Sequence, residues 1–135
     1  MGFLASIFGS ARQQHKTIIK NVLGETLLEL PVRDLYGSTC LQGKDLSHAC
    51  LRGQQLDGAD LENVDLFGAG LRNCSFARCY LKNANLAYAL IDGANFRCSN
   101  LDGTDLLHTN IKLSQLDGAN IGPKSTIPRV RVVVA

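Results

Sequence analysis

Residues 59–98 read ADLENVDLFGAGLRNCSFARCYLKNANLAYALIDGANFRC, and in this stretch every fifth residue is large and apolar. The same period runs without insertion through residues 39–123, where all 17 central positions are Leu, Ile or Phe. Two residues before each central position lies a second column of mostly small residues, broken only by Lys44 and Gln54. The stretch is therefore an array of five-residue units that share one pattern.

A period of five residues excludes both an α-helix and a flat β-strand. Along an α-helix, five residues advance by about 500°, so the leucines would share no face. Along a flat strand, an odd spacing sends successive leucines to opposite faces. One apolar column stays inside only if the backbone turns once in each unit. Four five-residue sides then make a square circuit of about 20 residues, and the circuits stack about 4.8 Å apart. The pattern predicts an all-β solenoid of about four coils.

Units such as Ala59–Asn63, Ala84–Tyr88 and Ala94–Cys98 resemble pentapeptide repeats of the A(D/N)LXX type, and the resemblance covers 85 of the 135 residues. It implies a right-handed quadrilateral parallel β-helix. It also implies a family with few established activities. The best-understood members resemble duplex DNA and bind type II topoisomerases, and many others have no assigned role.

The flanks divide the chain into three parts: an N-terminal amphipathic arm and cap (1–38), the repeat solenoid (39–123) and a C-terminal strand or cap (124–135). Apolar residues within 1–23 follow one helical stripe, and Gly24 is a suitable stop for a helix. Residues 26–30 and 127–135 are expected to be strands. Because an open coil exposes unpaired backbone and apolar core, both flanks are expected to cap the solenoid.

A second interpretation treats one flank as an arm that docks on a partner. The apolar residues of the first turns would then act as an anchor: Phe3, Leu4, Ile7 and Phe8. Attachment to a membrane surface through this amphipathic segment is a third option, although a membrane is not the expected partner. The sequence contains neither a signal peptide nor a transmembrane run, which favours the cytoplasm or an intracellularly assembled complex.

Stacking at 20 residues places Phe67, Tyr88 and Leu107 in one outward apolar stripe, with His48 and His108 beside it. Exposed apolar side chains on a solenoid suggest a contact surface for protein. The alternative is that the N-terminal segment folds over this stripe as an internal lid.

Cysteines and histidines do not form a catalytic or metal pattern. Cys74 and Cys79 belong to the inward column. Cys98 lies at a corner, where a disulfide bond to another chain is an alternative. His48 and His108 are three coils apart, about 14 Å, too far to share a zinc ion. With no phosphate loop, nucleophile elbow or Cys/His dyad, we expect no enzymatic activity, no cofactor and no metal.

The net charge of the repeats distinguishes the two remaining functions, a protein scaffold and a DNA mimic. Residues 39–123 hold nine acids and seven bases, a net charge of −2. A duplex about 20 Å long carries about 12 negative charges, which this stretch imitates poorly. The favoured function is a non-catalytic scaffold, a rigid docking or spacer module for protein partners in a larger assembly such as a virus particle. A homo-oligomer is compatible with this interpretation, and nucleic acid is not an expected partner. The alternative function is a DNA-mimicking binder of a topoisomerase such as gyrase.

Overall fold

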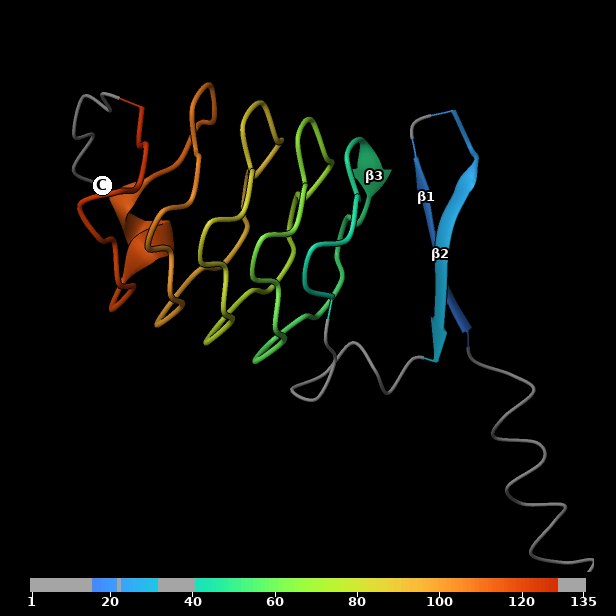
Figure 1. Ribbon diagram of the computed structural model, residues 1–135, viewed down its shortest axis with the longest axis horizontal. Helices are drawn as coiled ribbons and strands as arrows, with labels where there is room; N and C mark the ends of the chain where they lie inside the picture. Colours follow the sequence, from blue (N-terminus) through green and yellow to red (C-terminus); the bar gives the residue numbers. More distant parts are fainter. Residues whose placement is uncertain (1–15, 22, 32–40, 129–135) are drawn as a thin grey trace, which may run out of the picture.

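The computed structural model describes residues 16–21, 23–31 and 41–128. A hairpin of β1 (Lys16–Asn21) and β2 (Thr26–Pro31) precedes a stack of coils that includes β3 (Ala49–Cys50) and the short 3-10 helix η2 (Leu113–Leu116). Figure 1 shows the coils side by side along the long axis, with the hairpin at the N-terminal end of the stack.

The coils are joined by parallel bridges between residues that lie 20 positions apart. On one side the bridges connect Asp45 to Asp65, Asp65 to Asn85 and Asn85 to Asp105. The other sides repeat the spacing, as in the bridges from Gln55 to Ser75 and from Asp60 to Tyr80. Bridges every five residues and 20 residues between partners agree with the predicted circuit of four five-residue sides.

Backbone hydrogen bonds repeat with the same period. The amide of Leu66 donates to the carbonyl of Asn85 at 2.7 Å, and the amide of Asn85 donates to Val64 at 2.9 Å. Within the unit, the amide of Ala69 donates to Leu66 at 3.0 Å and closes a turn. Each unit therefore gains bonds to both neighbouring coils, which offset the conformational entropy lost on ordering its backbone.

The corner residue, two positions after the central residue, has a left-handed backbone in every described unit except those of Leu113 and Pro123. Asp117 has φ −56° and ψ 122°, and Gly118 follows with φ 69°, the geometry of a type II turn. Glycine adopts this φ without strain, and Asn83 (φ 59°) belongs to the residue type that tolerates it best after glycine. Turn chemistry thus explains the glycines and asparagines that recur at this position.

The two inward columns form one core along the axis. The central residues from Leu41 to Leu116 are all buried, and the small residues of the second column lie buried between them from Ala49 to Thr109. The rings of Phe76 and Phe96, one coil apart, stack with centroids 5.1 Å apart. These findings confirm the predicted inward orientation of both columns as far as Leu116 and Thr109, but the prediction is wrong for Ser114 and Ile121, which are exposed in the last units.

The N-terminal end differs from the expected helix. β1 pairs antiparallel with β2, and Lys20 and Asn21 of β1 pair antiparallel with Cys50 and Ala49 of β3. The helix predicted to run to Leu23 is therefore wrong over Lys16–Asn21. From Ile18 to Lys20 the burial alternates with a period of two, with Ile18 49% and Ile19 1% exposed and Lys20 exposed, which suits a strand.

Gly24, expected to end a helix, instead lies in the hairpin turn with φ +82°. The strand expected at residues 26–30 is confirmed by β2. The rest of the predicted helix, residues 1–15, lies outside the described residues.

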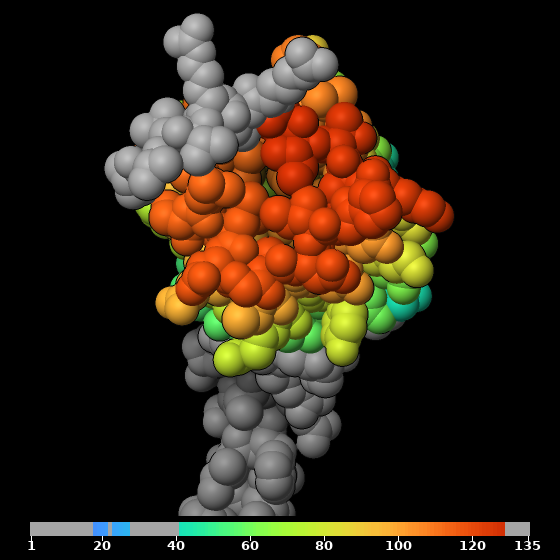
Figure 2. Space-filling view, turned by 90° about the vertical axis from the view of Figure 1, so that its left-hand side faces the viewer, coloured from blue at the N-terminus to red at the C-terminus, as the bar shows by residue number. Residues whose placement is uncertain are grey.

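At the C-terminal end the five-residue frame slips by one residue. Asp105 bridges to Thr126 instead of Ser125, although the other bridges join residues 20 apart. The proline ring fixes φ near −65°, so Pro123 cannot adopt the left-handed corner conformation that its position requires. Figure 2 looks at this end, where the last turn (red) lies across the front of the stack. Ile127 and Pro128 are not part of a strand, and residues 129–135 lie outside the described residues.

Candidate protein-interaction surface

Four aromatic rings follow one another along one corner of the stack, which we call the aromatic corner: His48, Phe67, Tyr88 and His108. The ring centroids of His48 and Phe67 lie 5.7 Å apart, and those of Phe67 and Tyr88 lie 5.3 Å apart. Tyr88 and His108 stack at 4.3 Å with an interplanar angle of 19°. The contacts are continuous from the first of these rings to the last.

Turn geometry produces this row. His48, Tyr88 and His108 occupy left-handed corner positions with φ 58° to 59°, and Phe67 directly follows a buried central leucine. The corner position between His48 and Tyr88 is Gly68, where an added Cβ would lie 2.7 Å from the His48 ring. The glycine therefore leaves the space into which the His48 side chain leans to reach Phe67.

The aromatic corner is open to solvent. Tyr88 is 53% exposed, Phe67 is half-buried, and both histidines are exposed. Leu107 is also exposed and occupies the column of Phe67, two coils further on. Of the residues proposed from the sequence, His48, Phe67, Tyr88 and His108 are thus brought together, with Leu107 on the same side. The other four, Phe3, Leu4, Ile7 and Phe8, lie outside the described residues.

The arrangement of the rings limits what this surface can bind. Because Tyr88 stacks on His108, those ring faces are turned towards each other along the axis and are not free to stack on a base or a sugar. The ring edges remain for apolar side chains and for groups with partial negative charge.

An acidic column runs beside the aromatic corner and contains Asp45, Asp65 and Asp105. One carboxylate oxygen of each accepts the amide of the residue two positions on, at 3.0 Å in all three cases. A second bond, from the Ser47 hydroxyl at 2.6 Å, and the Ser47 amide hold the pKa of the Asp45 carboxyl below its usual value. The Asp45 carboxylate therefore stays negatively charged at neutral pH.

Two exposed large residues were missed because they occupy a column that is otherwise mostly polar. Tyr80 is 58% and Leu90 50% exposed, and both directly precede a buried central residue. Elsewhere this position holds mostly Asp, Asn, Ser or Gln, whose role in the turn explains them. A large apolar residue in that column is the signal that would have identified them.

The four cysteines within the described residues fall into two groups. Cys50 and Cys98 are exposed, whereas Cys74 and Cys79 are buried and donate to the carbonyls of Leu51 and Leu56. Burial raises the pKa of the Cys74 thiol to about 11 and that of the Cys79 thiol to about 12. The buried thiols are therefore neutral and poorly nucleophilic at physiological pH.

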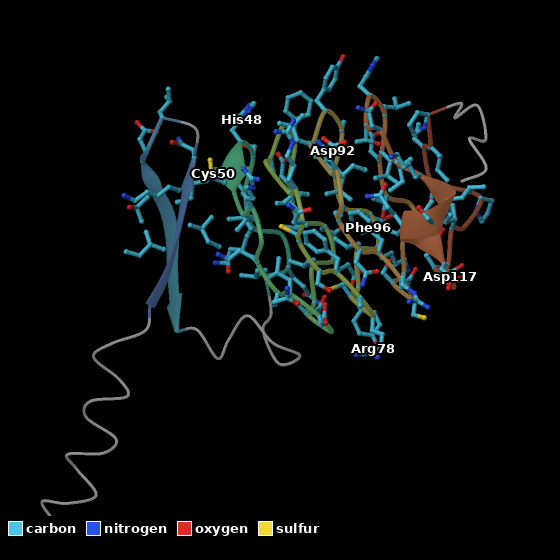
Figure 3. The ribbon with its side chains drawn as sticks, turned by 180° about the vertical axis from the view of Figure 1, so that it is seen from behind. His48, Cys50, Arg78, Asp92, Phe96 and Asp117 are labelled. Atoms are coloured by element: carbon cyan, nitrogen blue, oxygen red, sulfur yellow. The ribbon has the colours of Figure 1, made fainter. Side chains whose placement is uncertain are left out.

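Within the described ranges no three His, Cys, Asp or Glu side chains are grouped so that they could hold a metal ion. Figure 3 places His48 at one edge of the stack and Arg78 at the opposite edge. No helix in the described part of the chain has the length and apolar character needed to cross a membrane.

Comparison with known proteins agrees with this architecture. The family model for pentapeptide repeats matches eight copies, over residues 45–83, 59–97 and 79–121. No curated protein matches the chain.

Solved structures also match. A pentapeptide repeat protein from the thylakoid lumen of Arabidopsis thaliana is 28% identical, with a TM-score of 0.52 over 65% of this chain and 57% of that one. HetL from the cyanobacterium Nostoc, involved in heterocyst differentiation regulation, is 24% identical, with a TM-score of 0.54 over 64% of this chain and 44% of HetL. The plasmid-mediated fluoroquinolone resistance protein QnrB1 is 19% identical, with a TM-score of 0.51 over 64% of this chain and 42% of QnrB1.

The chain thus spans little more than half the length of the thylakoid protein and less than half of HetL. These neighbours imply a right-handed β-helix solenoid. Repeats matched over more than half of its length, at the spacing of the observed bridges, show that the chain belongs to the pentapeptide repeat family.

Proposed function

We propose that this protein is a non-catalytic docking or spacer module that binds a protein partner through its aromatic corner. Pentapeptide repeat proteins are in general scaffolds or interaction modules without enzymatic activity. The observation that carries the proposal is the unbroken contact of four aromatic rings on the outside of the stack. In the proposed form, a rod of about four coils presents this row of rings within a larger intracellular assembly, such as a multi-subunit complex or a virus particle.

These four rings lie outside the buried core of the coils. The inward columns already bury their apolar side chains, and the turns are closed by backbone hydrogen bonds. A contiguous apolar patch on the outside is therefore available for a contact between proteins.

The chemistry of the surface suggests the kind of partner. Ring edges favour apolar side chains, and the adjacent carboxylates of Asp45, Asp65 and Asp105 favour basic ones. The proposed partner segment therefore carries both apolar and Lys or Arg side chains.

The second candidate, a DNA-mimicking topoisomerase binder, is raised by the shared fold with QnrB1, whose name records fluoroquinolone resistance. An identity of 19% supports the fold alone. Two ion pairs, Arg72 with Asp92 at 3.2 Å and Arg97 with Asp117 at 3.1 Å, place cations among the acids of the rod. An interleaved pattern of this kind imitates the uniform charge of a duplex poorly.

Exchanging one exposed tyrosine tests the proposal. Tyr88→Asp places a charge in the aromatic corner, and Tyr80→Asp makes the same exchange in a different column with similar exposure. Affinity capture with quantitative mass spectrometry would nominate partners, and binding would then be measured with each purified partner. We expect Tyr88→Asp to weaken that binding at least about tenfold, as for a central contact residue, and Tyr80→Asp to leave it unchanged.

Equal binding by the parent and both variants would contradict docking at the aromatic corner. Inhibition of gyrase supercoiling by the parent, retained by Tyr88→Asp, would instead favour the DNA-mimic candidate.

The segment that carries Phe3, Leu4, Ile7 and Phe8 is a second proposed contact. Deletion of residues 1–15 leaves the β1–β2 hairpin intact and separates the two contributions. Loss of partner binding in this variant would support an anchoring arm. Liposome flotation that disappears on the same deletion would support membrane attachment instead.

A further inference from the structure

The side of the stack next to the aromatic corner carries a surface that is complementary to itself. Two outward columns form it, and we call it the Leu90 face: Cys50, Gly70, Leu90 and Asn110 in one column, and Arg52, Arg72, Asp92 and Lys112 in the other. We infer that the Leu90 face of one copy pairs with the Leu90 face of a second copy, with the two rods antiparallel.

Size complementarity is the first argument. Leu90 is 50% exposed and projects from its coil. Gly70 is its bridge partner in the preceding coil, and an added Cβ there would meet only the carbonyl of Ala49, at 3.8 Å. A prominence and an open notch therefore lie side by side, about 4.8 Å apart along the axis.

The proposed twofold axis is perpendicular to the rod and passes between the coil of Gly70 and the coil of Leu90. The axis reverses the order of the coils in the second copy and keeps each column opposite itself. Leu90 of each copy then lies over Gly70 of the other, so both prominences fill both notches.

Charge complementarity is the second argument, because the same axis places Arg72 of each copy opposite Asp92 of the other. Within one chain these side chains already form an ion pair of 3.2 Å, with 49% and 54% of their surfaces exposed. Pairing would give an alternating ring of two guanidinium and two carboxylate groups, in which each charge has an opposite neighbour on both sides.

Charge also decides against an axis through either coil and against parallel rods. An axis through the coil of Leu90 would oppose Asp92 to Asp92, and an axis through the coil of Gly70 would oppose Arg72 to Arg72. Parallel rods would place Leu90 against Asp92. An antiparallel axis one coil further on would lay Leu90 over Asn110 in place of the glycine notch. The antiparallel register between the two coils avoids all of these contacts. Its one unfavourable pair is Arg52 with Lys112, two exposed and flexible side chains at the ends of the face, where water and salt screen the repulsion.

The pairing is expected to be weak. Stable interfaces bury about 1,200–2,000 Å² in total, and one side of a rod about 20 Å tall offers less. Dimers should therefore form reversibly and be favoured where an assembly brings copies together. The pairing does not depend on partner binding at the aromatic corner.

Filling the notch gives the sharpest test, by sedimentation velocity over a concentration series up to about 1 mM. The parent should sediment as a monomer at low concentration and shift towards dimer as concentration rises. Gly70 has no positive φ, so Gly70→Leu fits the backbone, and its side chain would block Leu90 of the second copy. We expect this variant to lose the shift although it adds apolar surface, whereas non-specific association would grow.

Leu90→Gly should lose the shift as well, and the double exchange Gly70→Leu/Leu90→Gly should restore it, because prominence and notch have only changed places. Lys112→Glu should strengthen the parent's association by removing the one like-charged pair. Leu107→Asp, at the edge of the aromatic corner, is the control that should leave association unchanged.

Cross-linking tests the antiparallel register. The axis places Cys50 opposite Asn110 of the second copy, whereas within one chain these positions are about 14 Å apart. In a Cys40→Ser/Cys98→Ser background, Asn110→Cys with a short bismaleimide should give a covalent dimer. Lys82→Cys, exposed on the opposite side of the circuit, should give none above background.

A parent that stays monomeric throughout the series would overturn the inference. So would a Gly70→Leu variant that associates as strongly as the parent, or equal cross-linking at positions 82 and 110. These outcomes leave the Tyr88→Asp experiment unaffected, so failure of the pairing and failure of the docking proposal are distinguishable.

Discussion

Residues 41–108 and residues 109–126 belong to the same solenoid but differ in regularity. In the first stretch every corner position has a positive φ. In the second, Gly118 keeps this conformation, but Leu113 lies in η2 and Pro123 coincides with the slip of the frame. The central residues of the units that end in Leu113 and Gly118, Ile111 and Leu116, are buried although one corner is irregular and the other regular. The corner residue therefore controls the regularity of a coil more closely than the central leucine does.

Hydrogen bonds follow the same division. In the regular part the amides of Leu71 and Asn73 donate to Leu90 and Asp92 of the next coil, at 2.7 and 2.9 Å. One coil later, the corresponding amides of Ile91 and Gly93 have no backbone partner among the residues described. The Gln115 side-chain amide donates to the carbonyls of Ile91 at 2.7 Å and Ala94 at 2.9 Å. At Ala94 it takes the place of the Gln115 main-chain amide, which donates to Lys112. A side chain replaces part of the ladder where the corner departs from the left-handed conformation.

The largest contrast should come from a charge in the core. Leu86→Asp would place a carboxylate at a fully buried position of the regular part and should destabilise the fold by more than about 4 kcal/mol. Ile121→Asp, at a central position that is 37% exposed in the irregular part, should cost about 1–2 kcal/mol. Urea unfolding followed by circular dichroism measures both, and equal midpoints would refute the assignment of the core.

Alkaline pH should weaken the regular part through its buried thiols. The folded-state pKa values of Cys74 and Cys79, about 11 and about 12, lie above the ordinary value of 9.0. The thiols ionise in the unfolded chain first, so their contribution is complete below pH 9.0 and is lost as pH rises towards the folded values.

At pH 10 the loss should be about 2–3 kcal/mol for the two thiols together. Thermal melts between pH 8 and about 10.5 should show a steeper decline for the parent than for Cys74→Ala/Cys79→Ala. Parallel curves would show that these thiols do not ionise differently on folding.

Removing the two hydrogen bonds of the Gln115 side chain should have a moderate effect on stability. Gln115→Ala deletes both bonds to the carbonyls of Ile91 and Ala94 and should cost about 1–3 kcal/mol. Gln55 occupies the same column in the regular part and is exposed, so Gln55→Ala should change stability by less than about 0.5 kcal/mol. Chemical denaturation compares the pair, and a similar cost at both sites would show that Gln115 has no special role.

The smallest effect should come from a single corner glycine. Gly53 has φ +75° and no atom within 4 Å of an added Cβ, so Gly53→Ala should cost about 1 kcal/mol through backbone strain alone. Gly70→Ala, without a positive φ, should be close to neutral. Unfolding of both variants under one condition tests the contrast, which disappears if the left-handed conformation is not required.

The repeat pattern predicted the coils because each five-residue unit contains all the residues that form one side of a coil: the central apolar residue, the small inward residue and the corner residue of the turn. It did not reveal the hairpin, since Ile18 and Ile19 fit a helical stripe when read with Phe8 and Ala11, and only their alternating burial identifies a strand. Nor did it reveal η2, because Leu113 keeps the frame and differs only in its corner conformation. At the candidate site, the columns predicted which rings share a side. The column also shows Gly68 between His48 and Tyr88, but not that the His48 ring leans into the space above this glycine to reach Phe67.

Hydrogen–deuterium exchange tests the role of the corner most directly. In the parent, the amides of Leu71 and Asn73 should exchange slowly, whereas those of Ile91 and Gly93 should exchange faster. Leu113→Gly allows a positive φ at this corner and should slow the exchange of Ile91 and Gly93 towards the rates of their counterparts one coil earlier. If the four amides are equally protected in the parent, or if Leu113→Gly leaves Ile91 and Gly93 unprotected, the corner does not control the ladder.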